Sequence, residues 1–229
     1  MLHKFEIDMV AIDKQAITDT WLTADWDEYI KNVEHSASKE AKGYYHNNKY
    51  RIEAAPISNE HSQDHCLIGN AVLLYATLKG IPLMGKNNCS YRQAGLREFQ
   101  PDLSCYIGEN ANAIPWGVGI VNLNDYLAPD LVIEVSNTSL SDDLGEKRLL
   151  YEEVQVAEYW VIDVKNVNII AFAIPKGSRS VIADGGSRRI TESRVLTGLK
   201  LEILPEALKR SRNTNHTEVA SWLMQQFHS

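Results

Sequence analysis

Residues Pro129 to Asp163 read PDLVIEVSNTSLSDDLGEKRLLYEEVQVAEYWVID, and this stretch carries the strongest structural signal in the chain. The apolar run Leu131–Val135 predicts a buried strand. A polar loop follows, then a predicted helix over about 144–154 and a second strand over 159–164. This order of strand, helix and strand is typical of α/β and α+β folds, so we expect a central mixed β-sheet flanked by helices.

Two carboxylates, Asp130 and Glu134, are set into the first strand of this stretch. Burying an ionised carboxylate costs several kcal/mol unless a cation or a metal offsets the charge. Lys147 lies about one turn into the following helix and carries such a charge. An acid fixed on a strand with a lysine close behind it is therefore a candidate functional site.

The rest of the chain continues the mixed pattern of helices, strands and hairpins. We find no internal repeat, low-complexity tract or linker, so residues 1–229 are expected to form a single domain. The elements expected are helices over 17–33, 62–79 and 217–227, hairpins over 43–55 and 178–193, and strands near 82–84, 89–92, 103–107 and 167–174.

The composition is that of an ordinary globular protein, with 44% hydrophobic and 23% charged residues among 229. No apolar run approaches the roughly 20 residues that cross a bilayer, and the N-terminus lacks the features of a signal peptide. We therefore predict a cytoplasmic protein with no membrane partner. Cys66, Cys89 and Cys105 show no CxxC spacing, which indicates buried, reduced thiols instead of a disulfide framework or zinc site.

The formal net charge of −7 argues against a broad electrostatic attraction to nucleic acid. It does not exclude that partner, because a metal-dependent nuclease carries surplus acid that bound cations neutralise. Local basic patches also occur in the sequence. They are Lys147–Arg148, Lys176–Arg179 and Arg188–Arg189, with Lys209, Arg210 and Arg212 near the C-terminus.

Asp102 and Asp130 share the pattern Pro-Asp-Leu ahead of a predicted strand. If the strand that follows Asp102 pairs alongside 131–135, Asp102 and Glu134 converge on one hard cation. Magnesium suits so sparse a ligand set, because it is held by one or two carboxylates and keeps several waters. Either aspartate could instead be a turn residue or an N-cap, and this alternative is stronger for Asp130 than for Asp102.

Lys147 also has two interpretations. In the first, Lys147 is a solvated helix residue, because it lies in the charge cluster Glu146–Arg148. In the second, its side chain reaches back over the end of the strand and positions a water or stabilises negative charge on a phosphate. Tyr151 lies on the same helical face, where it would orient the lysine or simply pack. His61 and His65 flank the start of the long helix, with His61 expected before it, which favours structural roles over a zinc pair.

Other enzyme classes find no support in the sequence. The chain contains no phosphate-cradling Gly-rich loop, no Rossmann fingerprint and no GxSxG motif. Ser136, Ser139 and Ser141 have no placed histidine partner, which disfavours a serine hydrolase.

The motifs around the candidate acids and lysine resemble those of the Uma-type restriction endonuclease family, a branch of the PD-(D/E)XK nuclease-like superfamily. The resemblance rests on the stretch 129–163, on RIEAAPISNEH ahead of the long helix, and on FQPDLSCYI at the first Pro-Asp strand. It spans about residues 20–175, and the Glu-Val-Ser, Asp-Leu-x-x-Lys, Leu-Tyr and Glu-Tyr-Trp-x-x-Asp elements together make it specific. Residues 176–229 would form a C-terminal extension of strands and a helix.

The resemblance implies a restriction-endonuclease-like mixed β-sheet with helices on both faces. Asp102 would be the Pro-Asp acid and Glu134 the second acid, and together they would hold Mg²⁺ or Mn²⁺. The lysine usually found two residues after the second acid is replaced by Ser136 in this chain. Lys147, in the following helix, is the match for that lysine.

Three further residues match the family pattern with no role that the resemblance fixes: Asp130, His61 and Tyr151. The implied reaction is endonucleolytic hydrolysis of phosphodiester bonds in a nucleic acid, with DNA as the expected substrate. A catalytically silent relative that binds a nucleic acid or a protein is the first alternative. A homodimeric interaction protein is the second, with Trp21, Trp26 and Trp222 as interface anchors, although these tryptophans are as easily explained as core residues.

Overall fold

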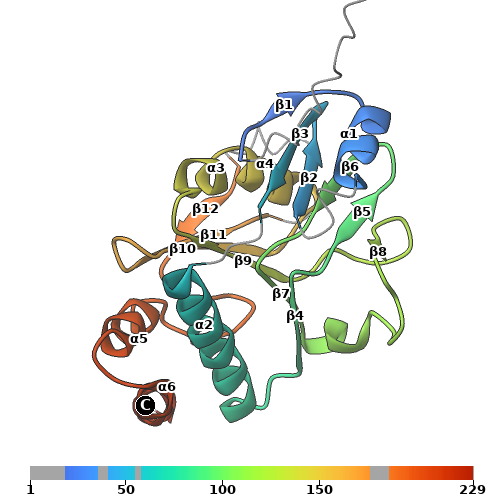
Figure 1. Cartoon of the computed structure of the whole chain (residues 1–229). Helices are drawn as coiled ribbons and strands as arrows, with labels where there is room; N and C mark the ends of the chain where they lie inside the picture. Colours follow the sequence, from blue (N-terminus) through green and yellow to red (C-terminus); the bar gives the residue numbers. More distant parts are fainter. Residues whose placement is uncertain (1–18, 36–40, 55–57, 176–185, 229) are drawn as a thin grey trace, which may run out of the picture.

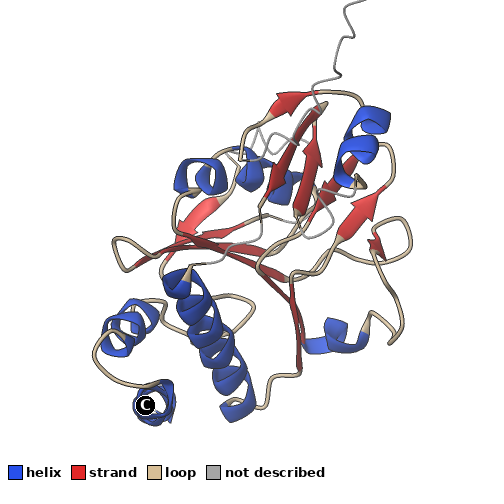
Figure 2. Ribbon diagram, in the orientation of Figure 1, coloured by secondary structure: helices blue, strands red, loops and turns tan. Residues whose placement is uncertain are grey.

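The computed structural model describes residues 19–35, 41–54, 58–175 and 186–228, and these form two β-sheets with helices on both sides of the central one (Figures 1 and 2). The central sheet has the order β12-β11-β10-β9-β7-β4. Only β9 and β10 pair in parallel within it, so the sheet is mixed as expected. Its strands are β4 (Leu83–Asn87), β7 (Leu103–Ile107), β9 (Leu131–Ser136), β10 (Glu158–Asp163), β11 (Asn168–Ala173) and β12 (Arg188–Ile190).

Strand β9 lies in the interior of this sheet and is buried on both faces. Leu131, Ile133 and Val135 pack into the hydrophobic core beneath the sheet, while Val132 packs into the core above it. This alternation follows from the period of two in a strand. Glu134 therefore points to the same face as Val132, the upper one.

Helix α2 covers the lower face of the sheet together with α5 and α6 (Figure 1). The Ser58 side chain accepts a hydrogen bond from the backbone N–H of His61 and so caps α2. The aromatic rings of Tyr75 and Phe227 meet edge to face between α2 and α6, with centroids 5.0 Å apart. The bounds are α2 (Asn59–Leu78), α5 (Ile203–Ser211) and α6 (His216–His228).

The upper face carries two short helices and the second sheet, of order β1-β3-β2-β6-β5-β8. At the centre of that sheet a hairpin turns through Asn47 (φ 51°) and Asn48 (φ 56°), the positive φ values of a type I′ turn. The bounds are β1 (Leu22–Thr23), α1 (Trp26–Val33), β2 (Lys42–His46), β3 (Lys49–Glu53), β5 (Tyr91–Gln93), β6 (Arg97–Phe99), η2 (Gly108–Asn112), β8 (Val121–Asn122), α3 (Leu140–Leu144) and α4 (Glu146–Glu153).

Several boundaries differ from the sequence prediction. Helix α1 begins at Trp26, because the Asp25 side chain caps it by accepting from Glu28 N–H. Helix α2 begins at Asn59, so His61 lies inside it and not ahead of it. The helix expected over 144–154 is α4, and a further short helix that was not predicted, α3, precedes it and meets it at Gly145.

Other differences concern whole elements and exposure. The second sheet and helix α5 were not predicted, and of the hairpin expected over 178–193 only β12 is seen, since 176–185 lie outside the described residues.

Cys66 is exposed and Cys105 buried, so the prediction of buried thiols is wrong for Cys66. Trp26 and Trp222 pack partly against hydrophobic clusters. In the described residues no helix is long and apolar enough to cross a membrane.

Candidate active site

A cavity of about 500 Å³ lies where the open end of the β2–β3 hairpin meets the start of α2, the central sheet and α4. Its walls contain three of the residues that the sequence singled out, Asp102, Glu134 and Lys147. These side chains are nearly inaccessible, with exposed fractions of 4%, 2% and 1% of the residue surface. Charges buried so deeply must be compensated by their neighbours.

Asp102 meets Glu134 because β7 and β9 are antiparallel neighbours. The register pairs Leu103 with Ile133, and the Asp102 backbone N–H donates to Glu134 Oε2 at 3.3 Å. In return, Asp102 Oδ2 accepts the backbone N–H of Val135 at 2.7 Å. The two acids that were expected to converge if their strands paired are therefore tied together through the backbone.

The Asp102 carboxylate is ionised in this environment. Burial works to raise the pKa of Asp102, but His61 Nε2, 3.2 Å from Oδ2, and the ammonium of Lys42 on Oδ1 together hold it well below its ordinary value. His61, which the sequence left without a role, thus contacts the Pro-Asp acid directly. Its place inside α2, one turn after the Ser58 cap, is what aims it at the sheet.

Glu134 is held differently, by hydroxyl groups. Tyr151 Oη donates to Glu134 Oε1 at 2.6 Å, and Tyr44 Oη, whose single hydrogen is shared with the Gln100 carbonyl oxygen at 2.8 Å, lies 3.1 Å from the same Glu134 oxygen. Burial raises the pKa of Glu134 to about 8, and the negative charges of Asp102 and Asp143 add to the shift, despite the opposing charge of Lys147. Without a further cation, Glu134 therefore retains its proton at neutral pH.

Lys147 is a buried cation, which overturns the interpretation of a solvated helix residue. Its Nζ lies 3.8 Å from Glu134 Oε1, 2.8 Å from Glu53 Oε1 and 2.9 Å from Asp143 Oδ1. The same Nζ lies 4.3 Å from the ring centroid of Tyr44. Burial opposes its charge, but the three carboxylates raise the pKa of Lys147 well above its ordinary value, so the ammonium persists.

Sequence reasoning missed the residues that the hairpin supplies: Lys42, Tyr44, Arg51 and Glu53. Arg51 is buried and bonds Glu53 Oε1 at 2.9 Å, which joins the hairpin to Lys147 through the shared carboxylate. The aromatic and aliphatic residues that flank the turn pair Asn47–Asn48 predicted the hairpin, but they gave no sign that its polar side chains are buried. A charged residue in an alternating strand is ordinarily assigned to the solvent face.

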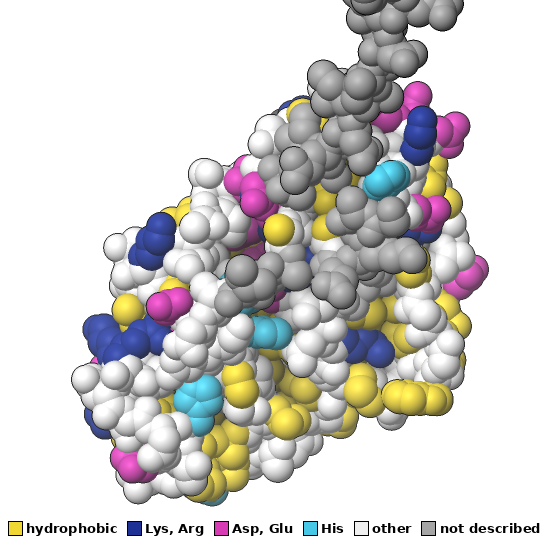
Figure 3. Space-filling view, in the orientation of Figure 1, with side chains coloured by type: hydrophobic (Ala, Val, Ile, Leu, Met, Phe, Trp, Pro, Cys, Tyr) yellow, Lys and Arg dark blue, Asp and Glu magenta, His cyan; other side chains and the backbone are white. Residues whose placement is uncertain are grey.

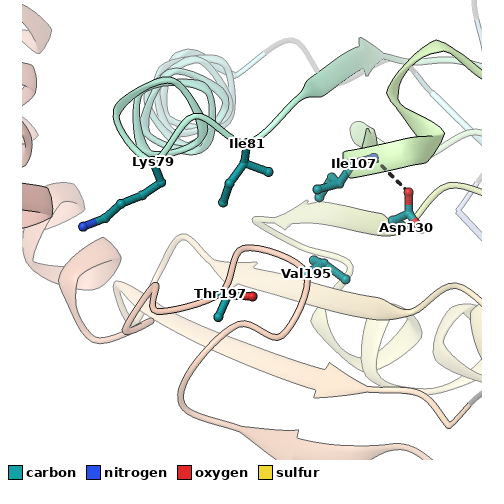
Figure 4. A pocket seen from close by; sticks show the side chains of 7 residues that line it. Lys79, Ile81, Ile107, Asp130, Val195 and Thr197 are labelled. Atoms are coloured by element: carbon teal, nitrogen blue, oxygen red, sulfur yellow. Dashed lines mark hydrogen bonds between the residues drawn. The ribbon is translucent and has the colours of Figure 1, made fainter.

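The structure places Asp130 outside this cavity. Asp130 precedes β9 at the end opposite to Ser136, and its Oδ2 accepts the backbone N–H of Ile107 at 2.8 Å (Figure 4). Its other oxygen accepts the side-chain amide of Asn110 at 2.9 Å. The residue lines a separate cavity with Lys79, Ile81 and Thr197, and there it acts as a turn-stabilising acceptor.

The donors at the cavity fit a hard divalent cation. Among the described residues, no three His, Cys, Asp or Glu side chains surround a common point, so the protein offers few ligands. Asp102 and Glu134 supply hard oxygen donors, the ligands that Mg²⁺ and Mn²⁺ favour when they retain several waters. The position also accepts positive charge, because the Lys42 ammonium already lies on Asp102.

Comparison with known proteins places the chain in a family. The Uma2 family, described as "Putative restriction endonuclease", matches residues 26–204. This chain therefore belongs to the Uma2 family, which confirms the resemblance noted in the sequence.

A solved structure shares the fold. The crystal structure of a "putative nuclease belonging to DUF820" from Anabaena variabilis aligns with a TM-score of 0.51 at 15% identity, covering 87% of this chain and 98% of that one. At this identity the match shows the fold alone, and it confirms the expected nuclease-like architecture. No curated protein matches the sequence.

Proposed function

We propose that this protein is a divalent-metal-dependent endonuclease that hydrolyses phosphodiester bonds in DNA. One observation carries the proposal: Asp102 just ahead of β7, Glu134 on the adjacent strand β9 and Lys147 on α4 meet at a single cavity. Membership of the Uma2 family supports nucleic acid as the substrate. The chemistry of the donors supports Mg²⁺ or Mn²⁺ as the cofactor.

Asp102 and Glu134 would hold the metal. An ion bound there supplies Lewis-acid polarisation of the phosphate and lowers the pKa of a bound water. Tyr151 and Tyr44 fix the Glu134 carboxylate from one side, and their hydroxyls stay protonated because burial and the Glu134 charge raise the pKa of both. Asp102 is fixed by the backbone of Val135.

Lys147 would act as a fixed positive charge. Its raised pKa keeps the amine protonated, which is incompatible with a general base at neutral pH. A cation 3.8 Å from a metal-binding carboxylate is instead suited to stabilise negative charge that develops on a phosphate. Glu53 and Asp143 hold this ammonium in place.

Attraction of the nucleic acid would be local. The sequence carries a net charge of −7, and on the face seen in Figure 3 the visible Lys and Arg side chains lie in separate groups, with no continuous belt. Of the basic patches in the sequence, Lys147 is buried and Arg212 pairs with Asp64 on α2. Bound cations at the cavity would supply charge that the surface lacks, and few phosphates would then be neutralised by Lys and Arg, so we expect binding to weaken only modestly with salt.

A catalytically silent relative is the second candidate, and the ion pair between Lys42 and Asp102 favours it. A lysine on the Pro-Asp acid neutralises the carboxylate that the metal requires. The same sheet would then serve to bind nucleic acid or protein without cleavage. The two candidates differ in their dependence on metal and on Glu134.

The test is cleavage of supercoiled plasmid, single-stranded DNA and RNA with Mg²⁺ or Mn²⁺. Wild type is compared with Asp102→Asn, Glu134→Gln and the matched control Asp130→Asn, which alters the second Pro-Asp-Leu acid outside the cavity. We expect metal-dependent cutting of DNA that is lost in the first two variants and retained in the control. Far-UV circular dichroism establishes that each variant is folded.

Three outcomes oppose the proposal in whole or in part. Cutting by Glu134→Gln at the wild-type rate would place the active site elsewhere or reveal a contaminant. No cutting by folded wild type on any of these substrates would favour the silent relative, and cutting of RNA alone would correct the substrate.

A further inference from the structure

The two oxygens of Asp102 have different partners. Oδ2 accepts two hydrogen bonds, from the Val135 backbone N–H at 2.7 Å and from His61 Nε2 at 3.2 Å, and these occupy both of its lone pairs. Oδ1 receives the ammonium of Lys42. A metal that binds Asp102 while the hydrogen bonds to Oδ2 persist must therefore use the oxygen on which Lys42 lies.

Lys42 is placed so that it can leave this oxygen. It is the first residue of β2, opposite Glu53 in the hairpin register, and it lines the same cavity of about 500 Å³ as Asp102. A lysine carries its charge on a flexible four-carbon stem, so the ammonium can move by several ångströms without movement of the strand. The cavity offers the space for that movement.

The second lysine of the site is held more firmly. Lys147 contacts Glu53 and Asp143 at 2.8 and 2.9 Å, while its distance to the metal-binding acid Glu134 is 3.8 Å. Displacing Lys147 would break two close ion pairs that do not involve Asp102 or Glu134. Of these two lysines at the cavity, Lys42 is therefore the one that competes for a metal position.

We propose that Lys42 is an internal counter-cation that occupies the metal position on Asp102 and is displaced when a divalent metal binds. This inference rests on the proposed metal-dependent function. In the metal-free protein Lys42 neutralises a buried carboxylate and so permits the site to fold without an ion. The same contact weakens metal binding, because the ion must replace a cation already in place. Release of Lys42 into the cavity would also leave an ammonium there for a phosphate.

Calorimetric titration with Mn²⁺ alone tests this competition. The variants are Lys42→Met and Lys42→Gln, with Lys49→Met as the matched control: the same hairpin and charge change, but a half-exposed side chain paired with Glu146. We expect both Lys42 variants to bind Mn²⁺ at least about tenfold more tightly than wild type, since the competing buried cation is gone. The control should stay within about twofold, because its charge is exposed and screened.

The outcomes separate the inference from the function on which it rests. Equal or weaker Mn²⁺ binding by folded Lys42 variants, in a protein whose wild type binds Mn²⁺ at Asp102, overturns the competition alone. Loss of Mn²⁺ binding in the Asp102→Asn variant would show that the Mn²⁺ bound by the wild type lies at Asp102. Absence of Mn²⁺ binding in wild type and in both Lys42 variants overturns the metal site, and with it the proposed function.

A measurement on the wild type remains informative if the variants do not fold. Lys42 is buried in the metal-free protein, so an amine-reactive reagent followed by peptide mass spectrometry should label it slowly. We expect saturating Mn²⁺ to increase labelling of Lys42 and to leave that of Lys147 low. Unchanged labelling of Lys42 at saturating Mn²⁺ would refute its displacement.

Discussion

Glu134→Gln should remove a large contribution to the pH dependence of stability in the metal-free protein, so that the variant is the less stable protein at low pH and the more stable one at high pH. Burial raises the pKa of Glu134 from an ordinary 4.5 to about 8. Between these values the folded protein keeps a proton that the unfolded chain releases, so this group's stabilising contribution is complete below about pH 4.5 and is lost as pH rises through about 8. The pKa difference corresponds to a loss of about 5 kcal/mol at about 1.4 kcal/mol per pH unit.

Glutamine cannot ionise, and it resembles the protonated acid in shape. Its oxygen can accept from Tyr151 and Tyr44, but its NH₂ then faces the Asp102 backbone N–H, which donates to Glu134 Oε2 in the wild type. The lost hydrogen bond costs about 1 kcal/mol. We therefore expect the variant to be slightly less stable than wild type at pH 5 and more stable by about 4 kcal/mol at pH 9.

Urea unfolding followed by tryptophan fluorescence, at pH steps from about 5 to 9 in the presence of EDTA, measures this difference. Other titrating groups are common to both proteins, so the difference in unfolding free energy isolates Glu134. A difference that stays constant over this range would refute the reasoning. It would show that the protein's own cations keep Glu134 ionised, and that the site holds no uncompensated carboxylate for a metal to neutralise.

Three further substitutions test the packing and the charges around the site. Lys147→Met leaves several buried carboxylates without their shared cation and should cost about 3–5 kcal/mol in urea unfolding; a cost below about 1 kcal/mol would contradict the buried ion pairs. Gly43→Ala should lower stability by about 1–3 kcal/mol in a thermal melt, because its Cβ would lie within 2.8 Å of Val33 Cγ2, whereas Gly85→Ala meets nothing closer than 3.8 Å and should behave as wild type. Asp130→Ala leaves a buried backbone N–H unpaired and should cost about 1–3 kcal/mol while Mn²⁺ affinity in calorimetry is unchanged, and a fall in that affinity would place Asp130 in the site.

The sequence predicted a central mixed sheet, and it predicted that its two acids meet if the strand after Asp102 pairs beside the strand that carries Glu134. Apolar runs and their period fixed β9, β10 and β11, and the turn residues Asn47 and Asn48 fixed the hairpin. The approach of Asp102 to Glu134 followed from two local facts, an acid just ahead of one strand and an acid inside another. It needed only the pairing of β7 with β9, which the structure confirms.

The same three-residue pattern occurs twice in the sequence, and the fold places its two copies in different environments. Asp102 and Asp130 both stand in Pro-Asp-Leu, yet the first lies in the cavity and the second accepts from Ile107 at another end of the sheet. Strand order decides this, because it sets which strand ends lie beside one another. No pattern within a few residues of either aspartate contains that information.

The buried charges were also decided by tertiary structure alone. Lys147 lies in a run of charged residues, a pattern that is typical of a solvated helix surface. It is buried because α4 packs against the face of β9 that carries Glu134. Lys42 meets Asp102 across 60 positions of sequence. Periodicity determined which side chains share a face of each element; which opposite charges then meet depends on long-range packing, since a buried charge is stable only where the completed fold brings its partner.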